Sequence, residues 1–526
     1  MKSFMKTKIK TLGLFAAGLL LSTSCSEDWL TVEKPDGEPL EEYYVTDARV
    51  FEALTAAYDP LEWPDWGLGQ YNALNIDAEI MGDLFWVGGS NYADMQNWHM
   101  LSDFVGDQSN TLSSLWTVDY SGVKRCNDVI KYVGWADAKG NLTEANKNSY
   151  LQQARVLRAY YYNMLWHYFG NVPFYVDDLQ EPYTAPQLSA DEIYENVIVD
   201  LEEVLQNCVL PMRWDAENAG RVSKAMGYML YAEMVMYKND ESRFAQAYKY
   251  MKEIIADTSN YGLVDDYAGI WTEGGEWSKE SIWEINYNDN NNDRGWSWAL
   301  GTGGTVLPTL ISPNSWPGGD GWDSGADGWG FLPVRTATYD MFEAGDVRRD
   351  ATCWDVRGIE YTKRYQDTHI WLAKYRPYTA NNADAGFDNN LNYNNNLRIY
   401  RMSEAYLNAA ELAARGCGSD AKELLTKVRE RAGLGAIDAT LDNIITERKL
   451  EFVGEGKRYW DLVRMEDVAG ATQKASTVLV PCDCDGTTPG DGGRLNAWKP
   501  NKKYIPIAQA ELDSDPALKQ NEEYFK

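Results

Sequence analysis

The helical periodicity of this chain comes in pairs, and a long loop-rich segment interrupts the series. Apolar residues recur at i, i+3 and i+4 over 222–237 and 244–255, and again over 397–414 and 419–431. Small alanines in both members of each pair let two helices pack closely, as in degenerate tetratricopeptide repeats. About 140 residues, roughly 258–396, separate the two pairs, far more than an ordinary connection needs. The pattern predicts a mainly α fold, a scaffold of helix pairs that carries a large loop-rich insertion.

Earlier segments extend this scaffold towards the N-terminus. Helical spacing covers 51–58, 112–132 and 150–165, and the last of these is expected to stop at Gly170 with Pro173 just beyond. The segment Ser189-Ala-Asp-Glu192 has the spelling of a capping box and predicts the start of a helix that runs through Leu205. We therefore place the scaffold at about 46–257 and 397–470 and the insertion at about 258–396. Short strands are expected inside the insertion, for example over 281–287, where Trp283 is predicted to belong to the core.

The first residues have the layout of a secretory signal. Four lysines precede a short apolar run over 12–21, which is too short to span a bilayer, and small residues then lead into Cys25. A cysteine at this point is typical of a bacterial lipoprotein signal. The sequence thus predicts a signal peptide over 1–24, lipidation of Cys25 and one domain over 25–526. The mature protein is expected to be tethered to a membrane only through lipid.

The net charge and the small number of histidines argue against several classes of ligand. The net charge is −30, and removal of the signal lysines makes it about −34, which disfavours nucleic acid and anionic lipid surfaces. The three histidines show no metal-ligand spacing, so no metal site or cofactor is predicted. Cys482-Asp-Cys484 is read as a loop disulfide or as free thiols. The stretch from Asp289 to Gly295 faintly resembles a calcium loop, but its glycine comes one place late and no glutamate closes it, which leaves a structural calcium ion as a minor alternative.

Tryptophan is concentrated inside the predicted insertion. Eight of the 21 tryptophans and eleven glycines fall between Trp271 and Trp329, and most of these rings stand among turn-forming residues. Rigid aromatic faces on irregular loops are suited to stacking against a flat, amphipathic ligand. A sugar ring is the commonest ligand of this kind outside the cell.

Five collinear motifs carry a resemblance to a known family. They are Arg155-Val-Leu-Arg-Ala-Tyr-Tyr-Tyr162 with Tyr168-Phe-Gly-Asn-Val-Pro173, then Gly220-Arg-Val-Ser-Lys224, then 397–411, then 445–464, and finally Tyr504-Ile-Pro-Ile507. Together with Cys25 and Trp29-Leu30, these motifs resemble the SusD/RagB family of nutrient-binding lipoproteins over essentially all of 25–526. The resemblance implies a SusD-like fold and a location on the outer membrane, facing the cell exterior.

The resemblance also implies a function, which is capture of an oligosaccharide or polysaccharide on an aromatic arc and its delivery to a SusC-like TonB-dependent barrel transporter. In the family this arc comes from an early loop region and from the long insertion. Matching aromatics to these two places gives the candidate stacking residues Trp98, Trp86, Trp296, Trp316, Trp322 and Trp329. Candidate hydrogen-bonding partners for sugar hydroxyls are Asp83, Asn97 and Asp320.

Two alternatives remain open. Capture of peptides or of another nutrient by the same architecture is one, and a glycan-cleaving enzyme, which needs two carboxylates about 5–10 Å apart, is the other. The charged residues of the 445–464 motif bear on the second. We interpret them as ion pairs between helices, because arginines beside each acid would keep it ionised and unfit to be a general acid. These residues are Glu447, Arg448, Glu451, Glu455, Arg458, Asp461 and Arg464.

Overall fold

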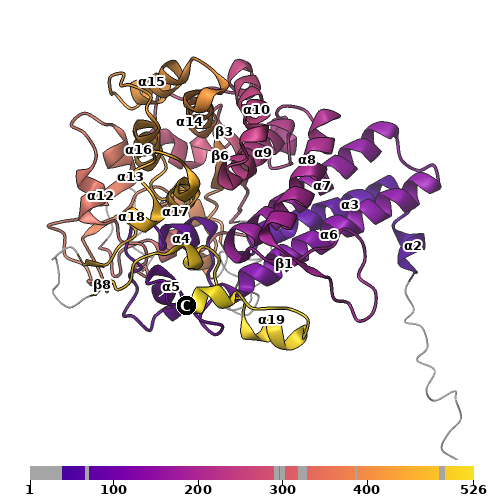
Figure 1. The fold of residues 1–526 in the computed structure, drawn as a ribbon, viewed down its shortest axis with the longest axis horizontal. Helices are drawn as coiled ribbons and strands as arrows, with labels where there is room; N and C mark the ends of the chain where they lie inside the picture. The colour runs from indigo at the N-terminus through magenta and orange to yellow at the C-terminus, as the bar shows by residue number, and fades with distance from the viewer. Residues whose placement is uncertain are drawn as a thin grey trace, which may run out of the picture.

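The structure is a computed structural model that describes residues 38–64, 70–289, 295, 303–317, 328–385, 388–484 and 492–526. The predicted signal peptide and Cys25 lie outside these residues. Helices form most of the regular structure, and the strands are short (Figure 1). Within the described part of the chain, no helix combines the length and the apolar character that crossing a membrane requires.

A row of helices forms the scaffold, and each member packs against the next one along the chain. The row runs across Figure 1 from the purple helices towards the orange ones. The short helix α3 (Asp47–Tyr58) packs on the side of α6. The row comprises α6 (Ser113–Ala138), α7 (Glu144–Phe169), α8 (Ala190–Gln206), α9 (Lys224–Lys238), α10 (Phe244–Ala256), α14 (Met402–Leu412) and α15 (Ala421–Arg431).

The row is continuous in space although a long segment interrupts it in sequence. Helix α10 packs directly on α14, so residues 257–396 leave the row and return to it. We call this segment the lobe. Strand β3 (Ser281–Ile285), near the start of the lobe, pairs antiparallel with β6 (Leu397–Arg401), which directly precedes α14. A second short ladder, β4 (Cys353–Asp355) with β5 (Ile370–Leu372), lies within the lobe.

Local signals placed several helix ends correctly. Helix α8 begins with the predicted capping box, in which the Glu192 amide donates to Ser189 Oγ at 3.3 Å and the Ser189 amide donates to the Glu192 carboxylate at 2.9 Å. Helix α7 ends at Phe169, followed by Gly170 with a φ of 71°. A side chain at Gly170 would meet the ring of Tyr504, so both the backbone and the packing require glycine there.

One predicted boundary is wrong. The helix expected over 397–414 begins only at Met402, because Leu397–Arg401 forms strand β6. This strand is almost completely buried, and it pairs with the equally buried β3. Five residues that are buried almost throughout do not distinguish a strand from the first turn of a helix by periodicity. The strand over 281–285 and the core position of Trp283, whose exposed fraction is 0%, are confirmed.

The remaining elements stand before, between and after the helices of the row in sequence. The segments α4 (Leu74–Glu79) and α5 (Gln96–Ser102) precede the row and lie beside the C-terminal part of the chain. That part contains α16 (Leu441–Glu451), α17 (Arg458–Arg464), α18 (Ala475–Val478) and α19 (Gln509–Ser514). Two ladders of two residues close loops: β1 (Val172–Pro173) with β2 (Gln187–Leu188), and β7 (Cys482–Asp483) with β8 (Gly493–Arg494). The lobe also contains the short helices α11 (Leu307–Leu310), α12 (Thr336–Asp340) and α13 (Arg348–Thr352).

A buried network of ion pairs, which we call the ionic core, ties the lobe to the scaffold. Glu451 on α16 is paired with Arg348 at 3.0 Å and with Arg401 at 2.6 Å, and it also contacts Arg431. Glu455 is paired with Arg401 at 2.7 Å and with Lys374 at 2.6 Å. All of these side chains are at most 3% exposed. Burial alone would raise the pKa of Glu451, but Arg431, Arg401 and Arg348 together hold it well below the usual range.

The interpretation of the 445–464 motif as ion pairs is confirmed. Glu447 is paired with Arg348 at 2.6 Å, and Arg448 is paired with Asp461 at 2.8 Å. Arg464 is paired with Asp461 at 2.8 Å and donates to Glu411 at 2.7 Å. Arg458 is paired with Asp83 at 2.8 Å. Every charged residue of the motif therefore has a buried or half-buried partner of opposite charge.

Candidate functional site

Two segments far apart in sequence meet where the early loop region contacts the lobe. Phe85 bridges to Val334 and Gly88 bridges to Phe331. The amide of Gly89 also donates to the carbonyl oxygen of Gly330 at 2.7 Å. The two regions in which the sequence placed the candidate stacking residues therefore lie side by side. Which rings this junction exposes decides what it can bind.

The prediction that Trp98 is a stacking platform is wrong. Its exposed fraction is 0%, and its indole N–H donates to Asp77 Oδ1 at 3.0 Å. The ring packs edge-to-face on Phe331, with the centroids 5.2 Å apart. Trp98 therefore joins the early region to the lobe from the inside, as a core residue.

Two further predictions at this junction are wrong for related reasons. Trp86 is only 4% exposed, because the guanidinium of Arg335 covers its ring at 3.8 Å from the centroid. Asp83 is not available to a sugar hydroxyl, since Arg458 holds it at 2.8 Å and Lys449 at 3.1 Å. Burial alone would raise the pKa of Asp83, but these two cations hold it well below the usual range.

Four other candidates remain predictions. Asn97 is half-buried on α5, and its amide nitrogen is buried without a hydrogen-bond partner among the described residues. Trp296, Asp320 and Trp322 lie outside the described residues. Trp296 and Trp322 therefore remain predicted stacking residues, and Asp320 remains a predicted hydrogen-bonding partner.

Trp316 and Trp329 are half-buried, and they flank the segment 318–327, which lies outside the described residues. The ring of Trp329 packs edge-to-face against Tyr71 with the centroids 5.2 Å apart, and Trp316 packs in the same manner against Trp354 at 4.7 Å. Tyr71 and Trp354 are also half-buried. We call these four rings the lobe site. The lobe site combines Tyr71, which precedes the early loop region, with three rings of the lobe, and neither Trp86 nor Trp98 belongs to it.

Backbone hydrogen bonds hold the lobe site at its base. The amide of Trp329 donates to the carbonyl oxygen of Thr309 at 2.8 Å, and the amide of Gly330 donates to that of Ser312 at 2.9 Å. The Asn314 side chain donates to the carbonyl oxygen of Gly328 at 2.9 Å. These bonds join residues 309–314 to residues 328–330, so the chain segments that carry Trp316 and Trp329 are held to one another. Rings fixed in this way lose little conformational freedom when a ligand stacks on them.

Polar groups lie close to the aromatic rings. The pKa of the Tyr71 hydroxyl is raised, first by burial and then by the charge of Asp94. Asp94 accepts from the Ser90 amide and from Ser90 Oγ, both at 2.8 Å. Carboxylates, hydroxyls and aromatic faces together can hold a polyhydroxylated ring by hydrogen bonds and stacking.

Sequence reasoning missed Tyr71 and Trp354. A signal for Tyr71 was present, because Trp66-Gly-Leu-Gly-Gln70-Tyr71 mixes aromatics with glycine as the later cluster does. Trp354 has no such signal, since it stands in strand β4 between Cys353 and Asp355. Its place beside Trp316 follows only from the folded chain.

The described residues offer little to a metal ion or to a disulfide. Across the described ranges, no group of three or more His, Cys, Asp or Glu side chains could hold a metal ion. Asp289 accepts the amide of Asp384 at 3.2 Å, and residues 290–294 of the possible calcium loop lie outside the described ranges, so that alternative stays a prediction. Cys482 is a free thiol that accepts a hydrogen bond from Arg335 at 3.4 Å, so no disulfide joins it to Cys484.

Comparison with known proteins gives a consistent result. The sequence profile of the SusD family matches residues 348–524. The SusD-like protein of Bacteroides ovatus is 25% identical over 88% of this chain and 83% of that protein. Surface glycan-binding protein A from Bacteroides uniformis is 58% identical, with 91% of this chain and 100% of that chain covered and a TM-score of 0.83.

Two further solved structures are of proteins that bind a named glycan. Surface glycan-binding protein A from Bacteroides thetaiotaomicron, solved in complex with laminarihexaose, is 50% identical, with 90% of this chain and 99% of that chain covered and a TM-score of 0.84. A laminarin-binding SusD-like protein is 26% identical, with 90% and 99% covered and a TM-score of 0.78. The similarity therefore extends over nearly the whole described fold, including the lobe.

Proposed function

Because this chain belongs to the SusD family, we propose that it is a non-catalytic surface protein that binds an oligosaccharide or polysaccharide by aromatic stacking and delivers it to a TonB-dependent transporter. The lobe site supports this proposal, since it contains two pairs of half-buried aromatic rings, one of which joins Tyr71 to Trp329 from a distant segment. Stacking on one such ring contributes about 0.5–1.5 kcal/mol beyond its buried area. Several rings of this strength suit reversible capture, which delivery requires.

The expected ligand is a neutral glucan of the laminarin type. Relatives of high identity are described as glycan-binding proteins, and one of them was solved with laminarihexaose. The charge of the chain supports a neutral ligand, because a net charge of −30 repels polyanions. We infer a glucan from the ligand of these relatives. The preference for an uncharged ligand follows in addition from the net charge of this sequence.

A binding role fits the acidic residues better than a cleaving role does. The carboxylates of the 445–464 motif are engaged in ion pairs, and arginines lower the pKa of Glu451. A general acid must instead carry a proton near the working pH. Peptide capture is the remaining alternative, and it would use the same half-buried rings.

Titration calorimetry with laminarin and laminarihexaose tests the proposal. We expect Trp329→Ala and Tyr71→Ala each to weaken laminarin binding by about 2- to 12-fold, which corresponds to the stacking free energy of one ring. The control is Trp135→Ala, which removes a half-buried tryptophan from the far end of α6. Equal affinity of all four proteins would overturn the assignment of the lobe site. Steady release of reducing ends by the wild type would overturn the non-catalytic role, and binding of peptides alone would favour peptide capture.

We further propose that Cys25 carries the lipid that holds the protein on the outer membrane, facing the exterior, and that the partner is a SusC-like barrel. The layout of residues 1–25 supports the lipid anchor, and family membership supports the partner. To test the anchor, the Cys25→Ala variant is expressed in a Bacteroides host, and the membranes are then fractionated. We expect the variant to leave the outer-membrane fraction, and its full retention there would contradict the anchor. Co-purification of the wild type with a barrel protein tests the partner, and its absence after mild detergent extraction would contradict it.

A further inference from the structure

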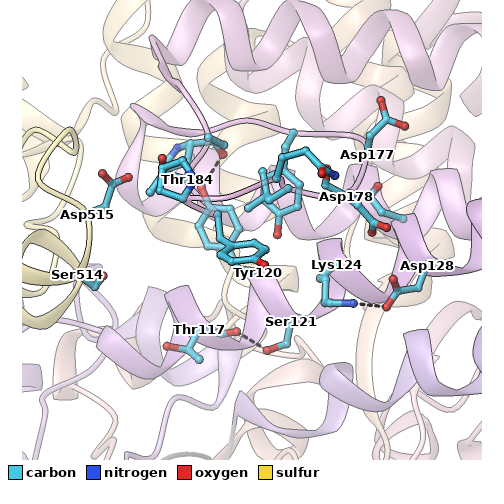
Figure 2. Close-up of a pocket in the computed structure, with 18 of the residues that line it drawn as sticks. Thr117, Tyr120, Ser121, Lys124, Asp128, Asp177, Asp178, Thr184, Ser514 and Asp515 are labelled. Carbon is cyan, nitrogen blue, oxygen red and sulfur yellow. Dashed lines mark hydrogen bonds and ion pairs between the residues drawn. The ribbon is translucent and has the colours of Figure 1, made fainter. Parts of the chain in front are cut away.

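A large groove opens beside α6, on the opposite end of the molecule from α12 of the lobe (Figure 1). Its volume is about 970 Å³, within the range of about 300–1,000 Å³ that is usual for small-molecule sites. Figure 2 shows its three walls. Thr117, Ser121, Lys124 and Asp128 of α6 form the floor, the loop over 174–186 between β1 and β2 forms the roof, and Ser514 and Asp515 of the C-terminal segment close one end.

Tyrosine rings line this groove, and they are held in place without a ligand. Tyr120 lies in the middle of the groove, where its ring is parallel to that of Tyr175 to within 8°, with the centroids 6.2 Å apart. The Tyr120 hydroxyl donates to the carbonyl oxygen of Pro173 at 2.7 Å. The backbone of Tyr175 is fixed from both sides by Tyr162, whose hydroxyl accepts the Tyr175 amide at 2.9 Å and donates to the Tyr175 carbonyl at 2.7 Å. The start of the roof, at Tyr175, is therefore held in place by the protein itself.

Tyr183 is the most informative residue of the roof. Its side chain is 70% exposed, the largest value among the exposed large hydrophobic residues of the described chain. Its backbone adopts a φ of 63°, a left-handed conformation that is uncommon for a bulky side chain. Exposure of a large ring and a left-handed backbone are both unfavourable in isolation. Such strained, exposed positions cluster at binding sites, where a ligand compensates for them.

The charges of the groove select against anionic ligands. Five carboxylates line it against two ammonium groups, and both of the latter are already paired. Lys124 contacts Asp128 at 2.5 Å, and Lys131 contacts Asp178 at 2.5 Å. Asp177, Glu511 and Asp515 have no cation among the lining residues. Carboxylates accept hydrogen bonds from hydroxyl groups, and Thr117, Ser121, Thr184 and Ser514 add hydroxyls of their own.

We propose that this groove is a second glycan-binding site, which takes a segment of a neutral polysaccharide through Tyr183, Tyr120 and the hydroxyl and carboxylate groups around them. This inference rests on the proposed function, because it assigns the groove the same class of ligand as the lobe site. A long chain held at both sites would dissociate more slowly than one held at a single site, since the second contact is intramolecular. A short oligosaccharide would fill the two sites independently.

The test counts sites with laminarihexaose and measures the affinity for long laminarin by titration calorimetry. We expect about two hexaose molecules per wild-type chain and about one for the groove variant Tyr183→Ala, whose affinity for long laminarin falls about tenfold or more. A second groove variant, Ser121→Arg, fills the floor from a solvent-facing helix position and should give the same result. The matched control is Phe51→Ala, which removes another exposed aromatic ring, 42% exposed, that does not line the groove.

The outcomes separate this inference from the proposed function. If the wild type binds one hexaose, Trp329→Ala weakens that binding, and the groove variants bind laminarin like the wild type, the groove inference is overturned while the proposed function stands. If the wild type binds no glycan, both are overturned. If the groove variants lose binding of peptides from a protein digest but keep two glycan sites, the groove is a peptide site and the inference is also overturned. Loss of one hexaose site in both groove variants, with the control unchanged, supports it.

Discussion

At the scale of single residues, Glu451 shows how a buried acid stays charged. It contacts Arg348, Arg401 and Arg431, and no part of its side chain is exposed. Removing one partner of a buried ion pair costs about 3–5 kcal/mol, because the remaining charge has lost its compensation. Glu451→Gln leaves three guanidinium groups around a neutral side chain. We therefore expect its free energy of unfolding, measured by guanidinium denaturation, to fall by about that amount.

The control for this variant is Asp438→Asn. Asp438 pairs with Lys422, but both side chains are largely exposed, so solvent screens the interaction and little change is expected. Equal unfolding free energies for the Glu451 variant and the wild type would show that the ionic core does not stabilise the fold.

Glu79 is a buried acid whose pKa is raised, in contrast to that of Glu451, which is lowered. Its Oε1 accepts the amides of Gly454 at 3.1 Å and of Gly456 at 2.9 Å. Burial, the larger effect, raises its pKa to about 8, although these amides oppose the rise. Because the folded-state pKa lies above the unfolded value of 4.5, the protonated form stabilises the fold fully below about pH 4.5. This contribution is lost as the pH rises through about 8.

Glu79→Gln should therefore flatten the pH dependence of stability. Glutamine can still accept both amides, but it does not ionise, so we expect the variant to gain stability relative to the wild type between about pH 5 and pH 9. Urea denaturation at several pH values in this window measures the effect. Glu523→Gln, a change at an exposed acid, serves as the control. Parallel pH profiles for Glu79→Gln and the wild type would contradict the raised pKa.

The residues that sequence reasoning assigned correctly differ in kind from those that it did not. The acids and arginines of the 445–464 motif alternate at helical spacings, which indicated a pairing role, although most of their partners, Arg348 and Arg401 among them, come from elsewhere in the chain. The burial of Trp98 depends instead on Phe331, and the cover over Trp86 depends on Arg335. Both partners are more than 200 residues away in sequence, and a tryptophan among turn-forming residues carries no signal for them.

At the scale of elements, the start of α8 depends on one hydroxyl group. Ser189 Oγ accepts the Glu192 amide, one of the amides that no helix carbonyl can satisfy. Replacing an N-cap serine with alanine usually costs about 0.5–2 kcal/mol. We expect Ser189→Ala to lower the free energy of unfolding by about 1 kcal/mol. Thermal and urea denaturation, with the conservative variant Ser189→Thr as control, measure this loss, and a larger loss for the threonine variant would contradict the capping role.

The part of the fold that the sequence predicts is the part that local signals of this type determine. The capping box at Ser189 and the stop at Gly170 fixed two helix ends, and periodicity identified the helices that form the row. Strand β6 was missed because pairing with β3, more than 100 residues earlier, decides its conformation. Tyr71 had a local signal in its glycine-rich surroundings, but its pairing with Trp329 brings together neighbours in space only and was not predictable from either segment.

At the scale of the whole molecule, net charge sets how binding responds to salt. The chain carries −30, but a neutral glucan gains nothing from this field, so its affinity should change by less than about twofold between low salt and about 0.3 M NaCl. A carboxymethylated form of the same glucan should bind more weakly at low salt and recover as salt screens the repulsion. Calorimetry with both polymers provides the comparison. Tighter binding of the anionic polymer at low salt would point to a local basic site that overrides the net charge.

The pairing of β3 with β6 has a consequence for how such a chain can diversify. The ladder of β3 and β6 closes the part of the lobe that lies between them, residues 286–396, so the distance between the two ends of that part is fixed whatever its length. Doubling the length of a loop with fixed ends costs only about 0.6 kcal/mol of closure entropy. Lobe segments outside those anchored by Arg348 and Lys374 can therefore lengthen, shorten or be exchanged between relatives without refolding the scaffold. New ligand preferences can arise by grafting such segments, while the helices beneath them remain the same.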